Sequence, residues 1–222
     1  MDLHQIPEFA AYPGVRSLLE RHVSMQLGDV RDMLRTPLPD AGITHGCNFA
    51  ACNVLCSLVS GISVSIYQPR QPTVTLKRGK RKGKKEWVGS GRAFKCLLED
   101  FFPWPSSQSA QSSVLAAEIY DYFRNPLAHS LGVQEEVAAR LVIKRMGPLT
   151  DQQLAELDQL ATRPGWLSST LTVAGHDHHL LVEGLYRDFL LMMQRLARDS
   201  TQMSAAEARL AKGKVVWRLG KP

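Results

Sequence analysis

Apolar residues recur every three or four positions through much of this chain, which is the spacing of amphipathic helices. The first such run lies between residues 15 and 35, and its apolar positions are Val15, Leu18, Leu19, Val23, Leu27, Val30 and Leu34. The segment Thr36-Pro37-Leu38-Pro39 predicts its end, because proline cannot continue a helix. Further helices are predicted over residues 43–67, over 91–101, and from about residue 114 into the segment that begins at Arg124.

The second of these predicted helices carries no formal charge. No Asp, Glu, Lys or Arg occurs between Ala41 and Pro69, and this stretch is long enough to cross a bilayer. Its serines and asparagines keep the hydrophobicity moderate, and a helix buried inside a bundle has the same composition. We therefore expect a core helix and no membrane partner.

The cysteines and the N-terminal residues bear on the compartment. The four cysteines, at positions 47, 52, 56 and 96, lack the CxxC spacing that is typical of metal sites. They are expected to be reduced, buried thiols, which is usual in the cytoplasm. The first residues carry acidic and polar side chains where a signal peptide needs a basic start and an apolar run. We expect a cytoplasmic protein that needs no cofactor.

The pattern changes after about residue 140. The remaining predicted elements are a strand over 141–146, a helix over 151–161 capped by Thr150, a strand over 169–174, a long helix from Asp177 to about Arg198, and a short helix after Ser200. We expect residues 1–140 to form a helical core that includes a basic loop at 70–90, and residues 141–222 to pack on that core within one domain. The predicted fold class is mainly α, with about four to five long helices, a small β-hairpin or strand pair, and a C-terminal helical extension.

A basic tract accounts for the net positive charge of the chain. Lys and Arg number 27 against 21 Asp and Glu, and one glycine-spaced run contains Lys77, Arg78, Lys80, Arg81, Lys82, Lys84 and Lys85. Such a run cannot bury itself, so it predicts a solvated loop between short hairpin arms at 73–76 and 86–88. A loop that binds RNA and a loop without a partner both fit this composition, and Trp87 favours contact with bases.

The segment Arg124-Asn125-Pro126-Leu127-Ala128-His129 groups a guanidinium, an amide and an imidazole. Arginine offers a planar fork of donors to phosphate oxygens, and histidine can take up or release a proton near neutral pH. Because proline disfavours helical angles at the preceding residue, we expect Asn125 to act as an N-cap with Pro126 at the first helical position. Arg124 and His129 would then face each other across a joint between two helices.

This arrangement resembles the HEPN superfamily. The resemblance covers roughly residues 15–135 and rests on four helices, on the Arg-Asn-x3-His motif near the start of the last one, and on the preceding helix, Arg92 to Pro103. It implies a HEPN-like helical bundle and a metal-independent endoribonuclease that acts as a homodimer. The positions that the resemblance makes active are Arg124, Asn125 and His129.

The chemistry implied by this resemblance fits the residue types. Attack of a ribose 2′-hydroxyl on the adjacent phosphate needs a base, an acid and positive charge on the transition state. His129 can serve as the acid or base, and Arg124 can stabilise the developing charge. A two-fold dimer would bring together two histidines, one for each proton transfer. Such an enzyme would be a toxin or defence effector restrained by an inhibitory or regulatory protein.

Alternative interpretations remain open. Arg124 and His129 could stabilise the helix junction alone, for example by bonding Asp121, and some members of the superfamily do not cut RNA. The protein would then be a helical module that binds RNA, a nucleotide or a partner protein without turnover. The cluster His176-Asp177-His178-His179 permits a metal site, but ligands for zinc usually come from more than one segment. We therefore expect a polar helix start there and no metal.

Overall fold

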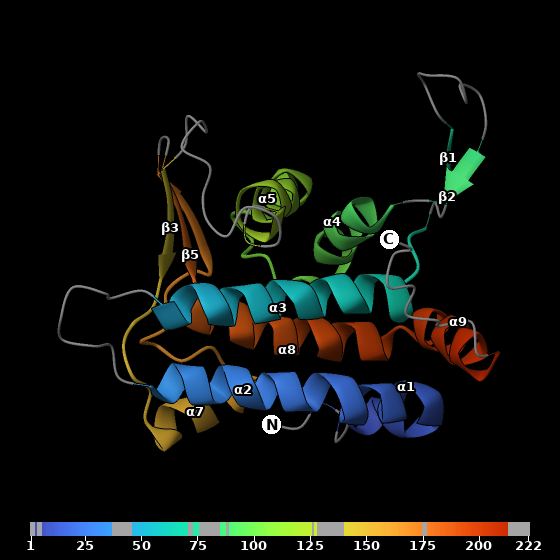
Figure 1. Cartoon of the computed structure of the whole chain (residues 1–222), viewed down its shortest axis with the longest axis horizontal. Coiled ribbons are helices and arrows are strands. Elements are labelled where there is room, and N and C mark those ends of the chain that lie inside the picture. Colours follow the sequence, from blue (N-terminus) through green and yellow to red (C-terminus); the bar gives the residue numbers. More distant parts are fainter. Residues whose placement is uncertain are drawn as a thin grey trace.

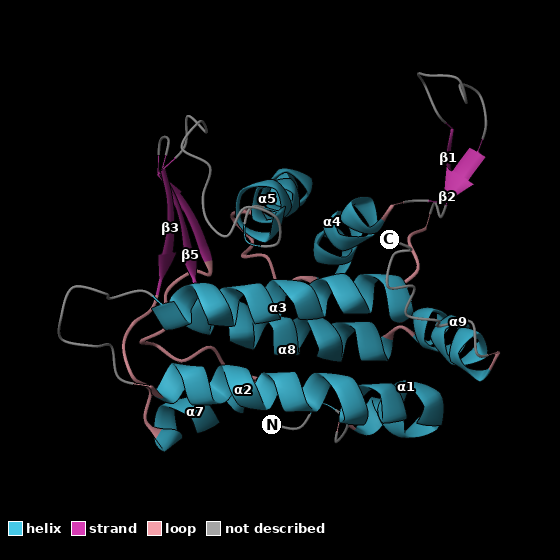
Figure 2. Cartoon of the chain, viewed as in Figure 1, coloured by secondary structure: helices cyan, strands magenta, loops and turns pink. Residues whose placement is uncertain are grey.

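The computed structural model describes residue 3 and residues 6–36, 46–70, 73–75, 85–87, 89–125, 127, 140–174 and 177–212. Helices dominate these residues, and the strands form a two-stranded hairpin and a three-stranded mixed sheet (Figures 1 and 2). The prediction of a mainly helical protein with a small amount of β structure is confirmed. The β content is larger than expected, because the C-terminal part contributes a third strand to its sheet.

One helical run begins at the first long apolar pattern. It follows a short 3-10 helix, η2 (Pro7–Ala11), and consists of α1 (Pro13–Leu18), a π-helical turn η3 (Leu19–Val23) and α2 (Ser24–Arg35). The predicted stripe is buried apart from Leu18, which is half-buried. The start at Pro13 suits proline, whose missing N–H is no loss in the first turn of a helix. The expected helix over 15–35 is therefore confirmed, with a slightly earlier start.

The uncharged helix α3 (Gly46–Ser65) packs against α2 and lies above it in the view of Figure 1. Its inner face, which includes Leu55, Val59 and Ile62, is buried, whereas Asn53 and Ser57 on its outer face are exposed. By length and composition α3 could span a membrane, but half of its most apolar stretch is buried inside the protein. That degree of burial is consistent with the core helix of a soluble protein.

Two further helices cover the side of α3 that faces away from α2 (Figure 1). They are α4 (Ser90–Phe101) and α5 (Ser112–Glu118), and α5 continues as a π-helical turn η5 (Ile119–Arg124). A one-turn 3-10 helix η4 (Ser109–Gln111) leads into α5. Phe94 of α4 packs edge-on against Tyr120 of η5, with ring centroids 5.3 Å apart. The predicted third and fourth helices are confirmed.

The C-terminal part contains a mixed sheet and three helices. The strands are β3 (Arg140–Lys144), β4 (Leu171–Ala174) and β5 (Asp177–Leu181), and the helices are α7 (Asp151–Asp158), α8 (Val182–Arg198) and α9 (Ser200–Ala211). The sheet order is β3-β5-β4, with β5 parallel to β3 and antiparallel to β4. One cluster of buried apolar side chains includes residues from this part and from the N-terminal helices.

The predicted helix start at Asp177 is wrong. Residues Asp177–Leu181 form the central strand β5, and the helix begins at Val182. The local capping signal of Asp177 is outweighed by tertiary pairing, because β5 has hydrogen-bonded neighbours on both edges. By contrast, Thr150 caps α7 as expected, and its side chain forms a reciprocal capping box with Gln153.

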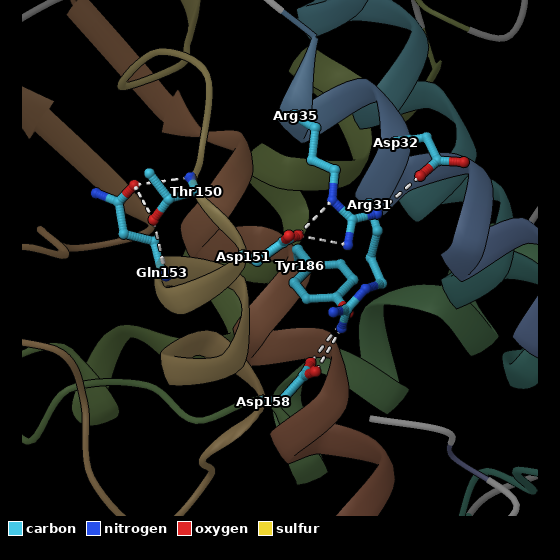
Figure 3. Close-up of polar contacts among 8 residues, drawn as sticks. All are labelled: Arg31, Asp32, Arg35, Thr150, Asp151, Gln153, Asp158 and Tyr186. Atoms are coloured by element: carbon cyan, nitrogen blue, oxygen red, sulfur yellow. Dashed lines mark hydrogen bonds and ion pairs between the residues drawn. The ribbon is translucent and has the colours of Figure 1, made fainter.

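Charged side chains link α7 and α8 to the N-terminal helical run (Figure 3). Arg35 pairs with Asp151 at 2.9 Å, and Arg31 pairs with Asp158. The Tyr186 hydroxyl accepts a hydrogen bond from Arg31 and donates one to Asp158, each at 3.2 Å. The contacts among Arg31, Asp158 and Tyr186 are partly buried, where such bonds are stronger than at the open surface, whereas the Arg35–Asp151 pair is exposed.

Candidate functional site

Arg124 ends the π-helical turn η5 and is held by two neighbours. Its Nε donates a hydrogen bond to Ser60 Oγ of α3 at 3.2 Å. Its guanidinium carbon lies 5.3 Å from the centroid of the Tyr120 ring, one helical turn earlier. The Lys95 ammonium lies 4.9 Å from the same ring and also pairs with Asp121 at 2.9 Å. Arg124 is therefore oriented by packing and a hydrogen bond rather than extended freely into solvent.

The expectation that Asn125 interrupts the helix is wrong. Asn125 has helical angles, φ −68° and ψ −48°, although it precedes Pro126. The neighbouring side chains explain this, because the burial of Phe123 and the Arg124–Ser60 bond hold the segment in its helical path. The Asn125 side chain is exposed and lies next to Arg124 in sequence. It therefore reaches solvent from a helical position instead of capping a new helix.

A pocket of about 270 Å³ opens beside Arg124. It is lined by Arg124 together with Asn53, Ser57, Ser60, Gly61, Val64 and Ser90, so α3, α4 and η5 all contribute. Its lining combines one permanent cation with an amide and several hydroxyl groups. These are the donors that proteins use for phosphate oxygens, and small side chains leave room for the phosphate to approach the guanidinium. We call this the Arg124 pocket.

The hairpin that carries the basic tract is followed in the chain by a helix whose first residue lines this pocket. Strand β1 (Thr73–Thr75) pairs antiparallel with β2 (Lys85–Trp87), which confirms the predicted hairpin arms. Soon after β2 ends, α4 begins at Ser90, which lines the Arg124 pocket. The cationic side chains from Lys77 to Lys84 lie outside the described residues, and for Lys85 the structure describes the backbone alone. The foot of the hairpin is thus adjacent to the pocket.

A second groove, of about 200 Å³, lies between α4 and the residues that follow α3. Arg70 and Arg92 line it together with Tyr67, Pro69, Cys96, Glu99 and Asp100. The Tyr67 hydroxyl donates to Asp100 at 2.7 Å, and burial together with this carboxylate raises the pKa of Tyr67. Burial also raises the pKa of the Cys96 thiol, so the thiol is not an activated nucleophile. Two arginines and two carboxylates therefore share this groove, so its formal charges balance.

His129 lies outside the residues that the structure describes, as does Ala128. Of the three active positions implied by the resemblance, the structure describes Arg124, which lines the pocket, and Asn125, which is exposed and is not among the lining residues. Asp121, the carboxylate proposed as a purely structural partner of the motif, is paired with Lys95.

The histidine cluster divides between the two faces of the sheet. His178 and His179 are consecutive residues of β5, so their side chains point to opposite faces. His178 is buried against the Tyr122 ring, 5.0 Å away, and its Nε2 lies 3.5 Å from Glu118 Oε1. His176 lies outside the described residues, and among those described no three potential metal ligands gather. The geometry gives a metal site no support.

Several residues of the site were not singled out from the sequence. Ser60, Ser57 and Asn53 come from the helix that was considered only as a core or membrane element. A signal was present, because Asn53, Ser57 and Gly61 recur at intervals of four and predict one small, polar face on an otherwise apolar helix. The contribution of Tyr120 to the placement of Arg124 could also be anticipated from their i, i+4 spacing.

No family model, no curated protein and no solved structure matches the chain.

Proposed function

We propose that this protein is a HEPN-type, metal-independent endoribonuclease that binds the RNA backbone at the Arg124 pocket. One observation carries the proposal: an arginine held by Ser60 and Tyr120 borders a solvent-accessible pocket at the foot of the hairpin that bears the basic tract. The resemblance of the Arg-Asn-x3-His motif adds the reaction type. A chain that carries both a fixed guanidinium and a run of seven cationic residues suits a polyanion better than a small anion.

In the proposed reaction, the 2′-hydroxyl of a ribose loses its proton to a base and attacks the adjacent phosphorus. The bond from phosphorus to the 5′-oxygen breaks, and that oxygen receives a proton from an acid. The products are a 2′,3′-cyclic phosphate and a 5′-hydroxyl. Arg124 stabilises the charge that develops on the phosphorane, where a donor fixed in advance needs no reorganisation. Asn125, exposed at the next position, orients the phosphate.

His129 provides one proton transfer in this proposal, and a homodimer provides the second through the His129 of the other copy. A histidine is suited to either role because its ordinary pKa lies near neutrality. An inhibitory protein partner would restrain the activity in a toxin or defence system. The residues proposed to guide RNA to the site are Lys77, Arg78, Lys80, Arg81, Lys82, Lys84 and Lys85.

The non-catalytic alternative is a helical module that holds RNA, a nucleotide or a partner protein without cutting. The two interactions of Arg124 with Ser60 and Tyr120 favour it as much as they favour catalysis, since both roles need a fixed phosphate donor. The two functions differ in turnover. They also differ in the effect of His129, which is essential for cleavage and dispensable for binding to the basic tract.

The test is cleavage of total RNA by the purified protein in excess EDTA, beside Arg124→Ala and His129→Ala. Arg16→Ala is the matched control, because Arg16 is an exposed arginine that lines neither the Arg124 pocket nor the groove of Arg70 and Arg92. The proposal expects cleavage by the wild type and by the control, and none by the two site variants. Folded wild-type protein that binds RNA without cutting it would replace the enzyme by the binding module.

A further inference from the structure

A third cavity adjoins the Arg124 pocket across the outer face of α3. It measures about 250 Å³ and lies between α3 and the helical run of α1, η3 and α2. Its lining is Leu18, His22, Val23, Gln26, Ser57, Leu58, Gly61, Ile62 and Ser65. Ser57 and Gly61 line this cavity and the Arg124 pocket alike, so the two cavities meet along α3. We call this third cavity the α3 groove.

The α3 groove has apolar walls and a polar rim. Leu18, Leu58 and Ile62 supply aliphatic surface, whereas His22 is exposed at the edge. The Gln26 amide nitrogen donates to the His22 carbonyl at 2.9 Å, which leaves the amide oxygen to face a donor. This combination differs from the Arg124 pocket, where a cation and hydroxyl groups predominate. The α3 groove therefore suits a flat, largely apolar group with polar edges.

Such a group lies next to every phosphate in RNA. Proteins that recognise single-stranded RNA receive unstacked bases against apolar or aromatic side chains and bind their polar edges. The cavity is smaller than the 300–1,000 Å³, roughly, of sites for drug-sized ligands, which fits a single base rather than a whole nucleotide. Because Ser57 and Gly61 have small side chains, nothing large on α3 separates such a base from a phosphate at Arg124.

We propose that the α3 groove is a nucleobase subsite, which receives a base neighbouring the phosphodiester held at Arg124. The inference rests on the proposed function. It adds a contact to the base of the RNA, whereas the Arg124 pocket contacts only the phosphate. It makes η3 and α2 part of the RNA surface, with His22 and Gln26 contacting the base edge. The two π-helical turns of the bundle, η3 and η5, then flank one continuous binding path. Such turns occur often at functional sites.

The test measures the affinity of a fluorescent single-stranded pentaribonucleotide, and of the same strand with abasic positions, in a His129→Ala background that prevents cleavage. Leu18→Trp fills the groove from a half-buried wall position, and Met25→Trp is its control on the same helical run, at an exposed position outside both cavities. We expect Leu18→Trp to weaken binding of the intact strand about tenfold and to leave the abasic strand unaffected. Met25→Trp should change neither affinity.

A second pair of variants protects the test from misfolding. His22→Ala and Gln26→Ala remove side chains at the rim of the groove without changing the packing of the core. They should also weaken binding of the intact strand and leave binding of the abasic strand unchanged. If Arg124→Ala weakens both strands while the groove variants weaken neither, the nucleobase subsite is refuted and the proposed function stands. If Arg124→Ala leaves both strands bound as before, the proposed function fails, and the subsite that depends on it fails too.

Discussion

Gly91 supports the position of Arg124 through a close approach to Tyr120. A Cβ at residue 91 would lie 2.4 Å from the Tyr120 hydroxyl oxygen and 2.6 Å from its ring carbon Cζ, far inside van der Waals contact. The ring cannot simply swing away, because it packs on Phe94 and carries the Lys95 and Arg124 side chains against it. The perturbation we choose is therefore Gly91→Ala, which forces the ring to move.

The expected magnitude follows from three contributions. Overpacking of this kind costs about 1–3 kcal/mol, and the loss of the Arg124–Tyr120 contact costs about 0.5–1 kcal/mol. The helix propensity of alanine offsets at most about 1 kcal/mol, and less so near the first turn of α4. We expect a loss of roughly 0.5–4 kcal/mol in the free energy of unfolding, centred near 2 kcal/mol. Because the guanidinium moves with the ring, RNA affinity should fall as well.

Urea unfolding followed by circular dichroism measures the stability change, and fluorescence anisotropy measures RNA affinity. Gly28→Ala is the matched control, because a Cβ at residue 28 meets nothing within 4 Å inside α2. That variant should gain about 0.5–1 kcal/mol and bind RNA normally. In a Tyr120→Ala background, Gly91→Ala should lose most of its cost. A Gly91→Ala protein as stable as the wild type would refute the reasoning.

Three further predictions concern the scaffold. Thr170→Val removes the hydroxyl that donates to the buried carboxylate of Asp188, and it should lower the free energy of unfolding in urea by about 1.5–3 kcal/mol, whereas Thr170→Ser should lose less. Glu207→Gln replaces the carboxylate that accepts hydrogen bonds from two backbone N–H groups at the start of α1. The free energy of unfolding should fall by about 1 kcal/mol, seen as a lower thermal midpoint, and an unchanged midpoint would contradict the capping role. A backbone hydrogen bond and Arg198 hold the pKa of Glu8 below its ordinary 4.5. The stability that Glu8 contributes is therefore present above pH 4.5 and is lost as the pH falls through the lowered pKa. Glu8→Gln should make the free energy of unfolding less dependent on pH in this acidic range, and an unchanged pH dependence would contradict the prediction.

The helices could be predicted because their apolar stripes are long and regular. Val15, Leu19 and Leu34 mark the first run, and the absence of charge marked α3. The two errors arose where a local rule met tertiary packing. Asp177 has the chemistry of a helix cap but joins the central strand of a sheet, and Asn125 precedes proline but stays helical because its neighbours are fixed against α3.

The site could be predicted only in part. The motif singled out Arg124, which lines a pocket, and Asn125, which does not line it; their role in phosphate binding stays a prediction that rests on residue type. Sequence spacing could not show that Ser60 accepts from Arg124, or that Gly91 makes room for the Tyr120 ring, because those contacts join helices that are distant in sequence. Pairing of the hairpin arms was predictable, but the adjacency of its foot to the Arg124 pocket required the packing of α4 on α3.

The central claim is RNA cleavage by 2′-hydroxyl attack at the Arg124 pocket. Its most direct test is mass spectrometry of the ends that the protein leaves on a defined oligoribonucleotide in excess EDTA. The account predicts 2′,3′-cyclic phosphate and 5′-hydroxyl ends, no cut where the attacking 2′-hydroxyl is replaced by hydrogen, and no product with Arg124→Ala. Ends bearing a 3′-hydroxyl, or equal cutting of the 2′-deoxy position, would contradict it.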